Sequence, residues 1–139
     1  MGKRGMHSVI RQSISLAEGE GRIIVATASE QGVPHTATGA NMSLVDVAKI
    51  RLRYWFCPNT IANVARNRWM SVVVWDPAGD RGYQLIGTVE QMVESAIADG
   101  YSPLEEAPSV PQVERELILA VQRVLEFREA PHNDRELPQ

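Results

Sequence analysis

The sequence predicts a mainly β fold with short helices, built as an antiparallel sheet that closes or half-closes into a six-stranded barrel. The length of 139 residues fits one domain, and the 44% hydrophobic and 22% charged residues are typical of a folded globular chain. Strand-like segments follow one another through short turns, which favours antiparallel pairing over βαβ units. Closure is expected because six strands in so short a chain would otherwise leave exposed sheet edges.

The first third of the chain predicts a helix followed by a hairpin. Within an N-terminal helical region, 1–20, the segment Ser8–Ala17 can place its apolar residues on one face. Arg22–Ala28 is a short apolar run rich in β-branched residues and predicts a buried strand. Ser29–Gly32 has the length of a hairpin turn, and Val33–Asn41 is the expected returning strand.

The clearest strand signal is the alternation in Ile50–Cys57. One face of this strand carries Ile50, Leu52, Tyr54 and Phe56, and the other carries Arg51, Arg53, Trp55 and Cys57. A short helix is expected over Thr60–Asn67, with Asn59 or Thr60 as its N-cap.

The second half predicts two more paired strands. Trp69–Trp75 and Tyr83–Val93 are joined by the turn Asp76–Gly82, and Gly87 suggests a bulge or bend in the longer strand. A helical piece is expected around Glu94–Asp99.

The C-terminal third is less regular. Leu117–Phe127 fits either a helix or a strand, and periodicity alone does not separate the two. Ser102–Pro111 has the composition of a linker, and Pro131–Gln139 has the polarity of a flexible, solvated tail.

Several classes of protein are excluded by composition. No apolar run approaches the roughly 20 residues that span a bilayer, and the start of the chain has no apolar signal core. Cys57 is the only cysteine, so no intrachain disulfide forms and a reducing, cytoplasmic setting is expected. The net charge of −3 argues against nucleic-acid or membrane binding through bulk charge. The three histidines stand far apart, which predicts no metal site.

Two segments have the chemistry of a ligand site. Asn59 and Thr60 stand where a strand leads into a helix, and free N–H groups at a helix start attract an anion. The alternative is that they only cap the helix. Thr38, Gly39 and Asn41 lie in a small, polar stretch that would let a flat ligand or a phosphate approach the backbone. The alternative there is a turn leaving the sheet.

Arginines and tryptophans gather in the middle of the chain. Arg51 and Arg53 lie on the same face of the predicted strand as Trp55, a pattern compatible with single-stranded nucleic acid. In an acidic chain a solvated strand face or a dimer seam is favoured instead, and Trp55 and Trp69 are candidate seam residues.

The order of these pieces from Arg22 to Met92 resembles the FMN-binding split-barrel family, the pyridoxamine 5′-phosphate oxidase-like proteins. The matching motif positions are Gly32, Pro34 and His35, then Thr60, Asn63, Val64 and Asn67, then Gly82, Gly87 and Val89. The resemblance implies a six-stranded split barrel and a homodimer with FMN at the subunit interface. It also favours a strand for Leu117–Phe127.

The resemblance implies a set of flavin contacts. The phosphate loop matches Asn59 and Thr60, the second flavin segment matches Thr38 through Asn41, and the strand beside the isoalloxazine ring matches Tyr54, Trp55 and Phe56. Family members often carry Lys, Arg or Ser at the position of Asn59, so one charge of the phosphate contact is missing in this chain. Arg51 or Arg53, from this subunit or its partner, is therefore the candidate source of positive charge for the phosphate.

The function that the resemblance implies is an FMN-dependent oxidoreductase with a small-molecule substrate or electron donor. The catalytic residues are not identifiable, which suits hydride or electron transfer governed by positioning. Two alternatives remain. One is a non-catalytic flavin carrier or electron-transfer module, and the other is a split barrel that uses a deazaflavin or haem.

Overall fold

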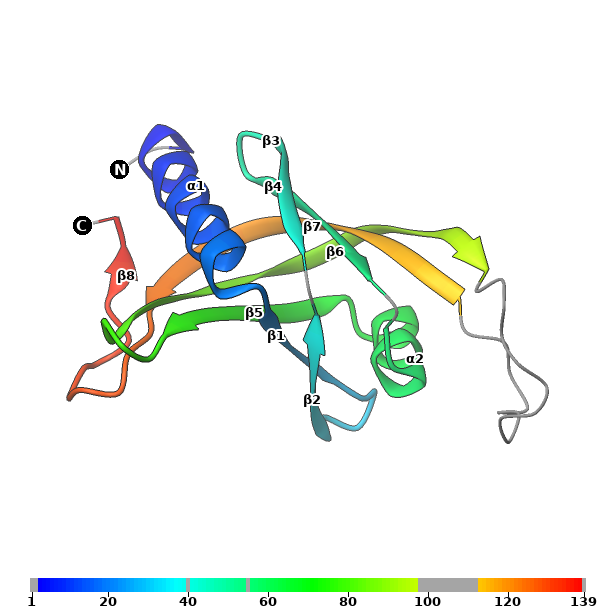
Figure 1. Cartoon of the computed structure of the whole chain (residues 1–139). Coiled ribbons are helices and arrows are strands. Elements are labelled where there is room, and N and C mark those ends of the chain that lie inside the picture. Colours follow the sequence, from blue (N-terminus) through cyan, green and yellow to red (C-terminus); the bar gives the residue numbers. More distant parts are fainter. Residues whose placement is uncertain (1–2, 40, 55, 98–112, 139) are drawn as a thin grey trace.

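The computed structural model describes residues 3–39, 41–54, 56–97 and 113–138, which form one antiparallel sheet and two helices (Figure 1). The helices are α1 (Lys3–Glu20) and α2 (Pro58–Arg66). The strands are β1 (Ile23–Ala28), β2 (Pro34–Gly39), β3 (Met42–Asp46), β4 (Lys49–Tyr54), β5 (Trp69–Asp76), β6 (Arg81–Ile97), β7 (Val113–Glu126) and β8 (Glu136–Leu137). Among these residues, no helix is long and apolar enough to cross a membrane.

The sheet curls toward a barrel. Its strand order is β2-β1-β5-β6-β7-β4-β3, so the two outermost strands follow each other directly in the chain (Figure 1). A methyl group built on Gly39 of β2 would lie 3.1 Å from Ile23 Cγ1 and 4.0 Å from the Tyr54 ring of β4. The end of β2 therefore approaches the far side of the sheet, and the mainly β, antiparallel prediction is confirmed.

The predicted number of six strands is wrong for the described residues, which form eight. The six predicted strands are present, and β3 and β8 are additional. β3 escapes prediction because Met42 alone of its residues is buried, so it lacks an apolar alternation. It exists because β4 supplies an antiparallel partner, with Met42 opposite Leu52.

The prediction of a helix around Glu94–Asp99 is also wrong for the part of this segment that the structure describes. Residues 94–97 continue β6 and pair with β7, and residues 98–99 lie outside the described residues. Pairing with β7 outweighs the local helical preference of these residues. The ion pair between Arg115 of β7 and Glu94, at 3.6 Å, is one contact of that pairing.

The ambiguous segment Leu117–Phe127 is a strand through Glu126, as part of β7 between β6 and β4. Gly87 marks the predicted bulge, because the β6–β7 register shifts between Ile86 and Gly87. The linker-like stretch Ser102–Pro111 lies outside the described residues. Residues 131–136 are exposed, but the segment is not a wholly free tail, because β8 pairs with β7.

The core lies between α1 and the inner face of the sheet. α1 packs against β3 and β5, and its predicted apolar face is confirmed by burial of Val9, Ile10, Ile14 and Ala17. Ser13 is buried on the same face, and its hydroxyl donates to the Val9 carbonyl oxygen at 2.9 Å, so no polar atom is stranded there. The alternation predicted for β4 is confirmed by the complete burial of Ile50 and Leu52.

Candidate functional site

The candidate site lies where β4 leads into α2. β4 ends at Tyr54, and α2 begins at Pro58 with Cys57 as N-cap residue. The predicted N-cap role of Asn59 or Thr60 is therefore wrong. Proline is suited to the first helical position because its missing N–H has no partner there anyway, and its ring fixes the helical φ angle. Asn59 and Thr60 consequently lie inside the first turn.

The start of α2 has no side-chain cap and no acidic residue in its first turn. The Ile61 N–H donates to the Cys57 carbonyl oxygen at 3.2 Å, but the earlier N–H groups belong to the unpaired first turn. The aligned peptide dipoles make this end of the helix partially positive. An anion bound at this helix end would accept hydrogen bonds from these N–H groups.

Thr60 adds a second, independent feature. Its side chain is completely buried, and its hydroxyl Oγ1 has no hydrogen-bond partner among the described residues. Leaving a buried hydroxyl unpaired costs about 1–3 kcal/mol, so such a group is uncommon without a ligand or water to satisfy it. Asn59, by contrast, is exposed.

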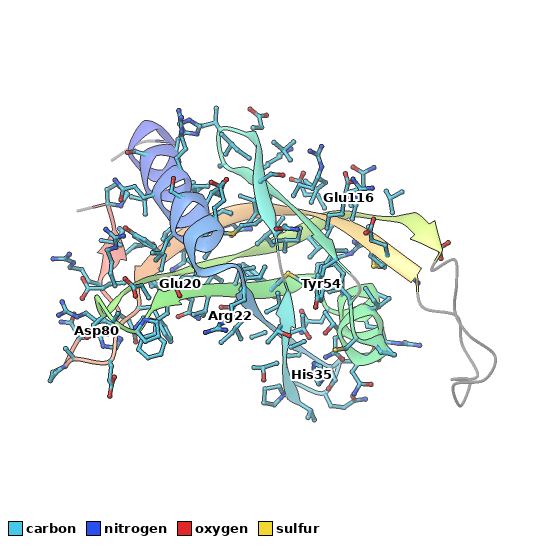
Figure 2. All side chains as sticks on the ribbon, viewed as in Figure 1. Glu20, Arg22, His35, Tyr54, Asp80 and Glu116 are labelled. Carbon is cyan, nitrogen blue, oxygen red and sulfur yellow. The ribbon has the colours of Figure 1, made fainter. Side chains whose placement is uncertain are left out.

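α2 is fixed against β1 by a polar contact. The Asn63 amide donates to the Thr27 hydroxyl at 3.0 Å, and Thr27 is buried opposite His35 in the β1–β2 register. His35 Nδ1 is also buried without a partner in the described part of the chain (Figure 2). Nothing in the sequence pattern singles out Thr27, because one threonine in an apolar strand is unremarkable.

The aromatic side chains predicted beside the ligand meet at the end of β4. The Tyr54 and Phe56 rings form an edge-to-face pair with centroids 5.9 Å apart, and both are half-buried. Trp55 lies outside the described residues. The structure thus places Gly39, Tyr54 and Phe56 together, just before the first turn of α2.

The two β2–β3 positions Thr38 and Asn41 are exposed. Alternation along β2 explains this for Thr38. Gly39 faces Ile23 in the interior, so its neighbour Thr38 faces outward. Both residues offer polar groups at the surface near the β2 end.

Arg51 and Arg53 are occupied by ion pairs across β4 and β7. Arg51 Nε lies 2.8 Å from Glu116 Oε1, and Arg53 Nε lies 2.8 Å from Glu114 Oε1. The hydrogen bond to Glu114, reinforced by Coulomb attraction, raises the pKa of Arg53 above its ordinary value. Both predicted sources of positive charge therefore already have carboxylate partners.

Arg22 is a cation that the motifs did not indicate. It immediately precedes Ile23, which pairs with Gly39 at the end of β2 (Figure 2). It is exposed and has no ion pair within the described ranges. Its signal in the sequence is faint, since it is one arginine at the start of an apolar strand.

Comparison with known proteins finds solved structures that share this fold. No protein-family model matches the chain, and no curated protein matches it. One similar solved structure is a protein from Clostridium acetobutylicum related to general stress protein 26, of the pyridoxinephosphate oxidase family (16% identity, TM-score 0.64, 94% of this chain and 96% of that one). Another is an FMN-binding protein from Syntrophomonas wolfei subsp. wolfei (11% identity, TM-score 0.64, 89% of each chain). A third is an F420 reductase (19% identity, TM-score 0.56, 79% of this chain and 93% of that one).

The chain has the split-barrel fold of the pyridoxamine 5′-phosphate oxidase-like proteins, as the sequence resemblance predicts. At 11–19% identity these likenesses establish the fold.

Proposed function

We propose that the chain binds FMN by its phosphate at the first turn of α2 and serves as a flavin-dependent oxidoreductase. The observation that carries this proposal is the uncapped start of α2 combined with the buried Thr60 hydroxyl, which has no hydrogen-bond partner in the part of the chain that the structure describes. Each feature by itself has a purely structural explanation. Together they describe donors without an acceptor, which is what a phosphate supplies.

The residues present fit a flavin in their chemistry. The first-turn N–H groups and Thr60 would hold the phosphate, and the Tyr54–Phe56 ring pair offers apolar surface for the ring system. Thr38 and Asn41 offer exposed polar groups near the end of β2. Bound FMN would supply hydride or electron transfer, and the protein would supply binding and orientation.

Arg22 is proposed as the source of positive charge, in place of Arg51 and Arg53. Using either of the latter would require breaking an ion pair with Glu116 or Glu114. Arg22 has no such pair in the region that the structure describes, and its strand leads to the β2 end.

The proposed working unit is a homodimer, with the cofactor at the subunit interface. Ile24 and Trp69 are 45% and 52% exposed, and both lie on the outward face of neighbouring strands. Val73, opposite Ile24, is half-buried on the same face. This apolar surface favours association with a second copy. Light scattering after size exclusion tests it, and a monomer at micromolar concentration would contradict it.

A second candidate is a deazaflavin in the same site. It is favoured by the fold shared with an F420 reductase. A non-catalytic flavin carrier would use the same contacts. The carrier and the enzyme differ in whether a small substrate oxidises or reduces the bound cofactor.

The deciding experiment is the visible spectrum of the purified protein, with mass analysis of any released cofactor. Flavin maxima and the mass of FMN would support the proposal, whereas a deazaflavin or haem spectrum would support the alternatives. A colourless protein that takes up no added FMN would refute the FMN assignment.

A further inference from the structure

Two adjoining hollows lie beside α1, away from the candidate flavin site. The first, here called the C-terminal chamber, has a volume of about 530 Å³ and lies between α1, the β5–β6 turn, the end of β7 and residues 135–138. Asp80, which lines it, lies at the opposite end of the molecule from α2 (Figure 2). None of the predicted flavin-contact residues lines it.

The walls of the chamber combine polar and charged residues with a set of apolar ones. Its apolar lining residues are Val9, Tyr83, Phe127, Leu137 and Pro138. The volume falls within the range of roughly 300–1,000 Å³ that is usual for small-molecule sites. The chamber can therefore accept an apolar group of moderate size.

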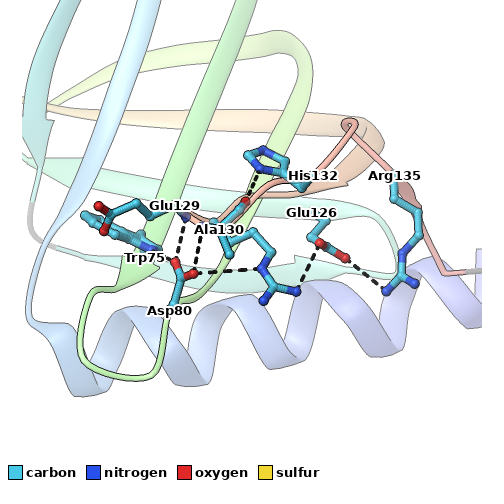
Figure 3. Close-up of polar contacts among 8 residues, drawn as sticks. Trp75, Asp80, Glu126, Glu129, Ala130, His132 and Arg135 are labelled. Atoms are coloured by element: carbon cyan, nitrogen blue, oxygen red, sulfur yellow. Dashed lines mark hydrogen bonds and ion pairs between the residues drawn. The ribbon is translucent and has the colours of Figure 1, made fainter.

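The wall formed by the C-terminal segment is held by Asp80 (Figure 3). Its carboxylate accepts hydrogen bonds from the N–H of Glu129 at 2.6 Å and of Ala130 at 2.9 Å, and from Trp75 Nε1 at 3.1 Å. These bonds, the one from Glu129 foremost, hold the pKa of Asp80 below its ordinary value. The wall is thus fixed by charge-assisted bonds before any ligand arrives.

Two of the three arginines that line the chamber form ion pairs with carboxylates that also line it. Arg135 lies 3.0 Å from Glu126, and Arg128 lies 3.6 Å from Glu126 and 3.9 Å from Asp80 (Figure 3). Arg81 is exposed and has no ion pair in the described part of the chain. Of the three arginines that line the chamber, Arg81 alone has no ion pair among the described residues, although Asp76 lies opposite it in the β5–β6 register.

Arg81 also lines the second hollow, a groove of about 910 Å³ that shares Gln12 and Tyr83 with the chamber. Arg11 lines this groove too, and none of its lining residues is acidic. The Tyr83 hydroxyl donates to Gln12 Oε1 at 3.3 Å, so the Gln12 amide nitrogen remains a donor. In a chain of net charge −3, this groove is locally cationic.

We propose that the chamber and groove bind an amphipathic monocarboxylate, with its apolar part in the chamber and its carboxylate on Arg81. A guanidinium binds a carboxylate in a fixed two-bond geometry, and Arg81 lies where the chamber meets a groove that Arg11 also lines. The inference does not depend on FMN, because it uses a different end of the molecule.

Calorimetric titration with decanoate, below its micelle concentration, tests the proposal. We expect saturable binding near one molecule per chain, weakened about tenfold to a hundredfold by Arg81→Gln. The matched control is Arg66→Gln, which removes an exposed arginine on α2 outside both hollows and should leave decanoate binding unchanged. Gly5→Leu adds bulk at a chamber-lining position and should also weaken binding.

Two further ligands separate the roles of charge and apolar surface. Decanol keeps the chain without the charge, and inorganic phosphate keeps an anion without the chain, so both should bind more weakly than decanoate. Equal affinity of wild type and Arg81→Gln for decanoate, or phosphate binding as tight as decanoate binding, would overturn the proposal. So would the absence of saturable decanoate binding in a wild-type protein whose melting curve shows that it is folded.

Discussion

Replacing Thr60 by valine separates a phosphate contact from a structural role. Valine keeps the β-branched shape and exchanges the hydroxyl for a methyl group, so the packing around this fully buried position changes little. The exchange removes one donor to the proposed phosphate. A hydrogen bond to a charged group contributes about 1.5–3 kcal/mol, so FMN affinity should fall about tenfold to a hundredfold.

The stability of the ligand-free protein should increase or stay the same in the Thr60→Val variant. Thr60 Oγ1 is buried without a partner among the described residues, and Thr60 does not cap α2. Its removal therefore breaks no hydrogen bond and relieves an unpaired polar group. We expect the free energy of unfolding to rise by zero to about 1 kcal/mol. A rise of about 1 kcal/mol corresponds to an increase of roughly 2–8 °C in melting temperature.

The assay is a flavin fluorescence titration of the wild type and the variant, together with thermal melts of both ligand-free proteins. Thr36→Val is the matched control, because Thr36 is exposed on β2 and lies outside the proposed contacts. An FMN affinity of Thr60→Val within twofold of wild type would refute the phosphate contact. A loss of about 1 kcal/mol in the ligand-free variant would instead indicate an unrecognised hydrogen bond.

Three other substitutions test separate parts of the structure. Arg22→Gln should weaken FMN binding by about tenfold at low salt, whereas Arg51→Gln should change it less than twofold, as titration of both variants will show. Asp80→Asn should lower the melting temperature at pH 7. Because the folded pKa of Asp80 lies below its unfolded value of 3.8, its contribution is fully present above pH 3.8 and is lost as pH falls from there through the folded pKa, so melts of the two proteins should converge only below pH 3.8. Gly87→Ala places a methyl group against the Ala120 carbonyl oxygen and should destabilise the fold by about 1–3 kcal/mol in denaturant titrations; an unchanged midpoint would contradict the tight β6–β7 approach.

The strands that the sequence predicts are those whose side chains alternate between core and solvent. β4 is the best case, because complete burial of Ile50 and Leu52 repeats the alternation of its sequence. β3 and the end of β6 depend instead on partner strands, from β4 and β7, that are distant in the sequence. A local pattern carries no information on such partners, so the strand count and the predicted helical piece around Glu94–Asp99 were wrong.

Parts of the candidate site follow from the resemblance, but its electrostatics do not. Tyr54 and Phe56 meet, as their shared face in the predicted strand Ile50–Cys57 indicated, although β4 ends at Tyr54. The pairing of Arg51 with Glu116 joins residues 65 positions apart, and only the β4–β7 register brings them together. A motif marks residue types, whereas the availability of a charge depends on what lies across the sheet.

The start of α2 shows how one residue changes a chemical interpretation. Had the helix begun two or three residues later, Asn59 or Thr60 would have been its N-cap residue, and the side chain could have satisfied one of its first N–H groups. Pro58 takes the first helical position instead, which moves both side chains inside the first turn and leaves the helix end uncapped. The same sequence that suggests an ordinary cap thereby yields free donors beside a buried hydroxyl with no partner in the described structure. The choice between capping and anion binding thus depends on where the helix begins, and the location of Pro58 favours the anion.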